Sequence, residues 1–211
     1  MVAEPQSQDL RAATDTLFAR RVEPGRALAD SSEDVARTCH AMALRFHRGG
    51  KVIVFGNGAA STDSLHISVE FVHPVIVGKR ALPGLSLTND VATLTGIAER
   101  EGFAEVYARQ VRQLGHADDI AFGVSLGGDS ENVLRGLAVG HELGLLTIAL
   151  TGAAGGAIAA SPDVDHALVV GSEDPLVAKE VQVTLYHILW ELVHVFFEQP
   201  GVLEPTIVRS W

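Results

Sequence analysis

The chain has 211 residues, of which 47% are apolar and 20% charged, a balance typical of one globular domain and one that excludes a disordered or low-complexity protein. Its 26 acidic residues outnumber its 16 lysines and arginines, and the formal charge of −10 argues against nucleic acid or an anionic membrane surface as a partner. The single cysteine, Cys39, excludes an internal disulfide and a cysteine-based zinc site.

Two amphipathic helices are predicted before the first strand. Apolar side chains recur every three or four positions over residues 10–22 and again over 35–46. Ser31 or Ser32 is expected to cap the second helix, and Gly49-Gly50 to end it. A minimal α/β unit does not need these two helices, and additions of this kind often form an oligomer interface.

Five short apolar runs predict a parallel sheet. They lack polar alternation, which indicates strands covered on both faces, and they occupy residues 52–55, 85–87, 120–124, 145–150 and 167–170. Small-residue loops and helical segments follow them, including 131–143 and a long segment over 175–197. This alternation is typical of an open α/β sheet, whose ligands bind beyond the carboxyl ends of the strands.

We expect a single domain over residues 1–211, with N-terminal helices over 1–50, an α/β core over 51–200 and a tail over 201–211. No linker divides the chain. The most apolar stretch, 183–197, is broken by His187, Glu191 and His194 and is too short to span a bilayer. The polar, acidic first residues do not resemble a secretory signal, so we expect a cytoplasmic protein.

Two glycine-rich loops are candidate anion sites. The first contains Asn57, Gly58 and Ser61; it is either a cradle at a helix N-terminus or a tight turn with Ser61 or Thr62 as a cap. In the second, the hydroxyls of Ser125 and Ser130 and the amides of Gly127 and Gly128 could bind a phosphate. Asp129 would repel a phosphate there, or it caps the next helix.

Three of the nine histidines precede a glutamate by four residues, a spacing that puts both side chains on one helical face. Only His66 and Glu70 lie on the helix that directly follows a glycine loop, so we select this pair as the candidate catalytic residues. His187 and His194 belong to the last helix, where we expect amphipathic decoration, although His187 lies in an apolar run and is alternatively a core residue.

Together these residues resemble the sugar isomerase (SIS) domain, and within it the phosphoheptose isomerase group. The resemblance rests on Gly56-Asn57-Gly58, His66 with Glu70, the loop from Ser125 to Ser130, Leu150-Thr151-Gly152 and His187, and it covers nearly the whole chain. It implies three layers, with a five-stranded parallel sheet between helices, and a homotetramer whose subunits share active sites. Residues 105–119 are also similar to the DnaA initiator-associating protein, a non-catalytic relative.

The resemblance implies an aldose–ketose isomerase of sugar phosphates. Glu70 and His187 match the family's acid/base pair, which moves a proton between C1 and C2 through an enediol. His66, Glu70 and His187 match three ligands of a zinc ion found in some members. His66 would orient Glu70 or share a metal with it. The phosphate is expected at Ser125, Gly127, Gly128 and Ser130, with Asn57, Gly58 and Ser61 lining the sugar.

Several positions depart from the family pattern. Ala59-Ala60 replace a glycine and a serine, the phosphate loop has lost two hydroxyls, and Lys179 stands where the family has a glutamine that binds substrate and zinc. The Lys179 ammonium either enters the site near Glu70, where it would bind substrate or replace zinc electrostatically, or it points to water. The alternative function is a non-catalytic tetramer that binds a sugar phosphate or a protein; retention of Glu70 and His187 favours catalysis.

Overall fold

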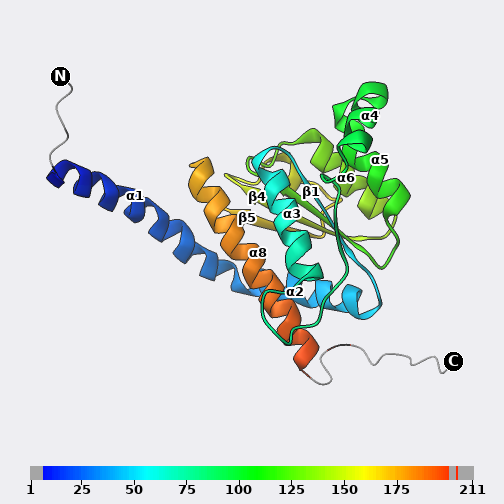
Figure 1. Cartoon of the computed structure of the whole chain (residues 1–211), viewed down its shortest axis with the longest axis horizontal. Coiled ribbons are helices and arrows are strands. Elements are labelled where there is room, and N and C mark those ends of the chain that lie inside the picture. The colour runs from blue at the N-terminus through cyan, green and yellow to red at the C-terminus, as the bar shows by residue number, and fades with distance from the viewer. Residues whose placement is uncertain (1–6, 200–202, 204–211) are drawn as a thin grey trace.

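The computed structural model describes residues 7–199 and 203, which fold into a single sheet with helices on both faces (Figure 1). The predicted tail over 201–211 lies almost entirely outside the described residues. The strands are β1 (Val52–Gly56), β2 (Gly84–Ser86), β3 (Ile120–Ser125), β4 (Leu146–Gly152) and β5 (His166–Val170). The α-helices are α1 (Ser7–Ala27), α2 (Ser32–His47), α3 (Ala59–Val72), α4 (Val91–Glu101), α5 (Val106–Leu114), α6 (Glu131–Glu142), α7 (Gly156–Ala159) and α8 (Pro175–Glu198), with short 3-10 turns at Leu28–Ser31 and Phe103–Glu105.

All five strands are parallel and lie in the order β2-β1-β3-β4-β5. The central strands β1, β3 and β4 are buried along their whole length, as their unbroken apolar sequences predict. The predicted strand positions are confirmed to within two residues. The differences are at the ends: Leu87 lies just past β2, and β4 continues through Thr151 to Gly152 because Thr151 pairs with Ser125 of β3.

Two apolar cores cover the two faces of the sheet, which confirms the three-layer architecture. Alternate strand residues such as Val54 and Phe122 pack against α2, α3 and α8. Their neighbours, such as Phe55, pack against α5, α6 and α7. The side chain direction alternates along each strand, so the central strands β1, β3 and β4 contribute to both cores.

The N-terminal helices lie where the sequence predicted them, but the predicted capping bond at the start of the second helix is absent. Ser31 occupies the N-cap position of α2, yet its hydroxyl donates to the Leu28 carbonyl and gives no cap bond. Gly49, with a φ of +93°, follows the C-terminus of α2 as expected. Helix α1 extends away from the sheet (Figure 1). Its apolar side chains Leu17 and Phe18 are exposed. Among the helices that the structure describes, none has the length and hydropathy that a bilayer crossing requires.

Candidate functional site

The two predicted glycine loops flank the point where the strand order reverses. The chain leaves β1 toward β2 on one side of the sheet, and it leaves β3 toward β4 on the other. The loop after β1 and the loop after β3 are therefore neighbours at the carboxyl edge, which is where open α/β sheets bind ligands. The topology thus places both candidate anion loops beside one crevice.

The first loop is held to the helix after β3 by a reciprocal pair of amides. The Asn57 amide group donates to the Asn132 side-chain oxygen at 2.7 Å, and the Asn132 amide group donates back at 2.9 Å. Gly58 has a φ of +54° and is the N-cap of α3, while the Ser61 hydroxyl donates to the Gly58 carbonyl at 2.7 Å. The Asn57 side chain and the Ser61 hydroxyl therefore stabilise the loop through hydrogen bonds inside the protein.

The second loop has an internal hydrogen-bond network. The hydroxyls of Ser125 and Ser130 lie 3.0 Å apart, and the Gly128 amide donates to the Ser125 hydroxyl at 3.1 Å. Ser130 is the N-cap of α6 but makes no side-chain cap bond, which leaves its hydroxyl directed at Ser125. At Gly127, a Cβ would meet open space. The loop thus presents small residues at the N-terminus of a twelve-residue helix, a geometry suited to an anion.

Asp129 does not cap α6, which corrects the expectation from the sequence. Its carboxylate accepts a hydrogen bond from the Ala157 amide at 2.9 Å, at the first turn of α7. The Asp129 side chain therefore binds the backbone at the start of α7, which follows β4. At Gly128, whose φ is +80°, a Cβ would lie only 2.1 Å from the Gly155 carbonyl oxygen, so the two loops interlock at positions that only glycine can occupy.

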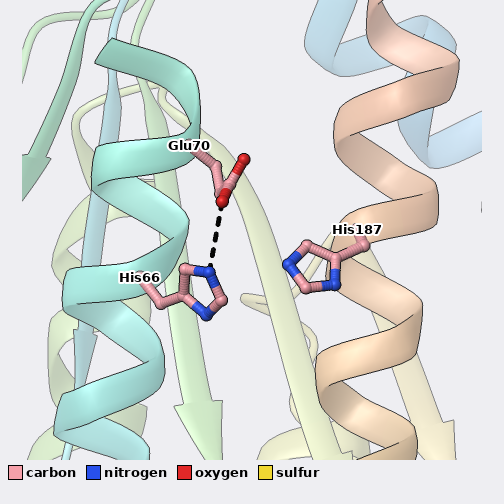
Figure 2. A group of neighbouring side chains, drawn as sticks. All are labelled: His66, Glu70 and His187. Atoms are coloured by element: carbon pink, nitrogen blue, oxygen red, sulfur yellow. Dashed lines mark hydrogen bonds and ion pairs between the residues drawn. The ribbon is translucent and has the colours of Figure 1, made fainter. Parts of the chain in front are cut away.

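His66, Glu70 and His187 point into the same gap between α3 and α8 (Figure 2). One ligand atom from each lies within 4.8 Å of the others. The His66 ring nitrogen Nε2 lies 3.2 Å from the Glu70 carboxylate, and the two imidazole rings meet edge to face with centroids 5.0 Å apart. Glu70 is 8% exposed, whereas both histidines keep contact with solvent. The selected pair and the histidine of the last helix thus form one acid/base cluster.

The Lys179 ammonium bonds to Asp63, a residue that the sequence analysis did not select. Its Nζ lies 2.7 Å from both carboxylate oxygens of Asp63, 3.0 Å from the Ala59 carbonyl and 3.3 Å from the Thr62 hydroxyl. Asp63 is 2% exposed. Lys179 therefore joins the first turn of α3 to α8, one and two helical turns before His66 and Glu70.

Two further α8 residues contact α3, and sequence reasoning missed both. The Tyr186 hydroxyl lies 2.7 Å from Nδ1 of His66, and the Trp190 indole donates to the Glu70 backbone carbonyl at 2.8 Å. Burial and the negative charges of Asp63 and Glu70 raise the pKa of the Tyr186 phenol above its usual value. No local pattern could have linked these residues, because α3 and α8 are about 120 positions apart in sequence.

Helix α8 also reaches the second glycine loop. The Gln182 side-chain amide lies 3.5 Å from the Ser125 carbonyl oxygen. His187 comes five residues later, about 7.5 Å further along the helix axis at 1.5 Å per residue. Helix α8 therefore contacts the loop after β3 and also carries His187.

His194 is not a residue of the polar, solvent-facing side of an amphipathic helix, contrary to the expectation from the sequence. It is 2% exposed, and its ring nitrogens lie 2.8 Å from the Trp190 carbonyl oxygen and 3.0 Å from the Arg80 carbonyl oxygen. Both neighbours are acceptors, so the imidazole connects α8 to the segment between α3 and β2. Glu191, in contrast, is exposed, as predicted for this helix.

Comparison with known proteins places this chain in a family. Residues 23–152 match the model of the SIS domain. Phosphoheptose isomerase from Thermodesulfovibrio yellowstonii is 40% identical over 161 residues, which are 76% of this chain and 79% of that protein; the enzyme from Aquifex aeolicus is 39% identical over 152 residues, 72% and 78% of the two chains.

Solved structures give the same relationship. Phosphoheptose isomerase from Francisella tularensis superposes with a TM-score of 0.81 at 30% identity, covering 87% of this chain and 97% of that one. The structure from Neisseria gonorrhoeae gives 0.80 at 28% identity, over 87% and 98%. With matches of this extent in both sequence and structure, the chain belongs to the SIS-domain family and, within it, to the phosphoheptose isomerases.

Proposed function

We propose that this protein is an aldose–ketose isomerase of a sugar phosphate, with sedoheptulose 7-phosphate as the first substrate to test. The observation that carries the proposal is the meeting of Glu70 and His187, from two helices distant in sequence, in one gap beside His66. Relatives of similar length named phosphoheptose isomerase support the same chemistry.

The reaction needs two groups with different roles. A base removes the carbon-bound proton from C1 or C2 while an acid protonates the carbonyl oxygen, which gives the enediol. The proton of the other enediol hydroxyl is then removed, and a proton returns to the neighbouring carbon. Glu70 is a carboxylate held in a largely buried position, and His187 is an imidazole with access to solvent, so both proton carriers are within reach of one substrate.

The substrate's phosphate is proposed to bind the loop of Ser125, Gly127, Gly128 and Ser130. The hydroxyl pair at 3.0 Å, the N-terminus of α6 and the unobstructed Gly127 support an anion there. Asn57, Gly58 and Ser61 would line the sugar through the backbone of the first loop, because the side chains of Asn57 and Ser61 already form hydrogen bonds within the protein. Lys179 is proposed to act on the substrate only through Asp63 and α3, given its four oxygen contacts.

We propose that zinc is the metal that His66, Glu70 and His187 would hold. Two imidazoles and a carboxylate are a zinc donor set that leaves one coordination position open. Their spread of up to 4.8 Å exceeds the roughly 3.4 Å between ligands in a tetrahedral zinc site, so the side chains must close by small rotations. When bound, the ion would polarise the substrate carbonyl. Metal analysis of protein purified without added metal, with Glu70→Gln as the control, tests this assignment.

We also propose a cytoplasmic homotetramer, because phosphorylated sugars are cytoplasmic metabolites and the described surface carries apolar side chains that suit subunit contacts. A shallow groove of about 660 Å³ beside His66 is lined by apolar residues of α3, among them Leu65, Val69 and Val72. Further exposed apolar residues lie along α1. Light scattering after gel filtration tests the assembly, and a monomer at micromolar concentration would contradict it.

The decisive experiment follows proton exchange at C1 and C2 in heavy water for a panel of ketose and aldose phosphates. Wild-type protein is expected to exchange and interconvert sedoheptulose 7-phosphate or a related phosphosugar, and Glu70→Gln to lose both activities. Glu191→Gln is the matched control, because this exposed carboxylate lies one turn from His187 on the same helix. Absence of exchange on every substrate would refute the isomerase and favour a non-catalytic sugar-phosphate-binding protein.

A further inference from the structure

Tyr186 lies at the acid/base cluster, but the proton transfers described above do not use it. Its ring meets both histidine rings edge to face, with centroids 5.3 Å from His66 and 4.9 Å from His187. The residue is 3% exposed, and its hydroxyl reaches Nδ1 of His66 at 2.7 Å. The Tyr186 hydroxyl bonds to His66 and not to the Glu70 carboxylate, so its hydrogen bond reaches Glu70 through His66.

The hydrogen bonds around His66 determine which ring nitrogen carries the proton. Nδ1 faces the Tyr186 hydroxyl, and Nε2 faces the Glu70 carboxylate at 3.2 Å. Within the described part of the chain, the Tyr186 hydroxyl has no other hydrogen-bond partner. If Nδ1 carried the proton, the phenol would have to accept, and its own buried hydrogen would lack an acceptor. The arrangement that satisfies every group has the phenol donating to Nδ1.

The bond at Nδ1 also determines the protonation of Nε2, the other ring nitrogen of His66. A neutral imidazole has one proton, and an accepting Nδ1 leaves that proton on Nε2. Nε2 then donates to one oxygen of Glu70, which fixes the carboxylate and leaves its other oxygen for a substrate proton. The same proton occupies the nitrogen lone-pair position that a metal ion would need.

We propose that Tyr186 is a positioning residue for Glu70: its hydroxyl donates to Nδ1 of His66, fixes the imidazole with its proton on Nε2, and thereby orients the Glu70 carboxylate. The catalytic meaning of this chain of bonds rests on the proposed isomerase function, whereas the bonds themselves do not. The same hydrogen bond lowers the affinity of the proposed zinc site without abolishing it, since metal binding through Nε2 forces the His66 proton to Nδ1 and leaves the phenol hydrogen without an acceptor.

The test is the protonation pattern of His66 in the full-length protein. Long-range proton–nitrogen correlation spectra of protein labelled with nitrogen-15 histidine distinguish the two ring tautomers, and His66→Gln identifies the signal. Wild-type protein is expected to show the proton on Nε2 of His66, and Tyr186→Phe a mixture or a shift toward Nδ1. Tyr107→Phe is the matched control for the spectra, because it removes an equally buried hydroxyl that bonds to the Gly56 carbonyl.

Metal affinity gives an independent readout. Titration with zinc or cobalt against a chelator is expected to show about fivefold tighter binding to Tyr186→Phe than to wild type, the equivalent of one neutral hydrogen bond. If Tyr186 instead accepts from Nδ1, the substitution weakens metal binding. That result, or a wild-type His66 with its proton on Nδ1, overturns the proposal.

Kinetics separate this proposal from the function it rests on. If the protein is an isomerase, Tyr186→Phe is expected to lower kcat about tenfold with little change in KM, because Tyr186 orients Glu70 without touching the substrate. If no substrate is found, the tautomer and metal results still decide the proposal. Should Tyr186→Phe fail to fold, the wild-type spectrum alone tests it, and a proton on Nδ1 refutes it.

Discussion

The ion pair between Lys179 and Asp63 predicts a large effect on stability from a single substitution on α8. The Asp63 side chain is 3% exposed and the Lys179 side chain 29%. Lys179→Met keeps the length and packing of the side chain but leaves the Asp63 carboxylate without its ammonium. Removing one partner of a fully buried pair costs about 3–5 kcal/mol, and because water can reach the lysine end here we expect about 2–3 kcal/mol.

Equilibrium unfolding in urea at neutral pH and fixed protein concentration measures this loss. A double-mutant cycle with Asp63→Asn isolates the pair, and we expect a coupling free energy of about 2 kcal/mol, since the double variant buries no unpaired charge. Lys79→Met is the matched control. Lys79 pairs with Glu198, whose side chain is 60% exposed, so this substitution should cost below about 1 kcal/mol. If Lys179→Met costs no more than Lys79→Met, the reasoning from burial is wrong.

Three further predictions concern the loops and the rest of the core. Gly128→Ala should destabilise the protein by more than about 3 kcal/mol, because its Cβ would collide with backbone at a positive φ, whereas Gly127→Ala, with open space for a Cβ, should leave the melting temperature within a few degrees. His194→Leu should cost about 1–3 kcal/mol and speed hydrogen exchange in residues 73–83, since it removes the ring nitrogens that lie against the Trp190 and Arg80 carbonyls; unchanged exchange there would contradict the bridging role. Burial opposes ionisation of Asp119, but hydrogen bonds from the Lys51 side chain and nearby backbone amides outweigh it and lower the pKa of this carboxyl. Its contribution to stability is therefore present above the unfolded-state pKa of about 4 and lost as the pH falls through the lower folded-state pKa, so Asp119→Asn should flatten the acid limb of the stability curve.

Much of the fold could be predicted because it depends on short-range patterns. Unbroken apolar runs such as 120–124 identify buried parallel strands, and glycines at their ends identify the loops at the carboxyl edge. The contact between His66 and Glu70 is equally local. Residues four apart on a helix face the same side, and the structure places these two groups 3.2 Å apart.

The partners of those groups could not be predicted from spacing or periodicity. His187, Tyr186 and Lys179 face α3 only because α8 packs beside it on the same face of the sheet, across about 120 residues of sequence. Helical periodicity assigns side chains to an apolar or a polar face, but it does not say which helix covers that face. For the same reason His194 looked like surface decoration in the sequence and proved to be a buried bridge between two carbonyls.

The sequence by itself therefore determined the strands, the glycine loops and one half of the acid/base cluster, since each depends on residues close together in the chain. The family resemblance pointed to His187 as the other half, but only the tertiary structure brought it opposite Glu70, because the docking of α8 on α3 depends on the packing of the whole sheet and its two cores. That docking places the second histidine opposite Glu70, a phenol on the first histidine and an ammonium on a buried carboxylate.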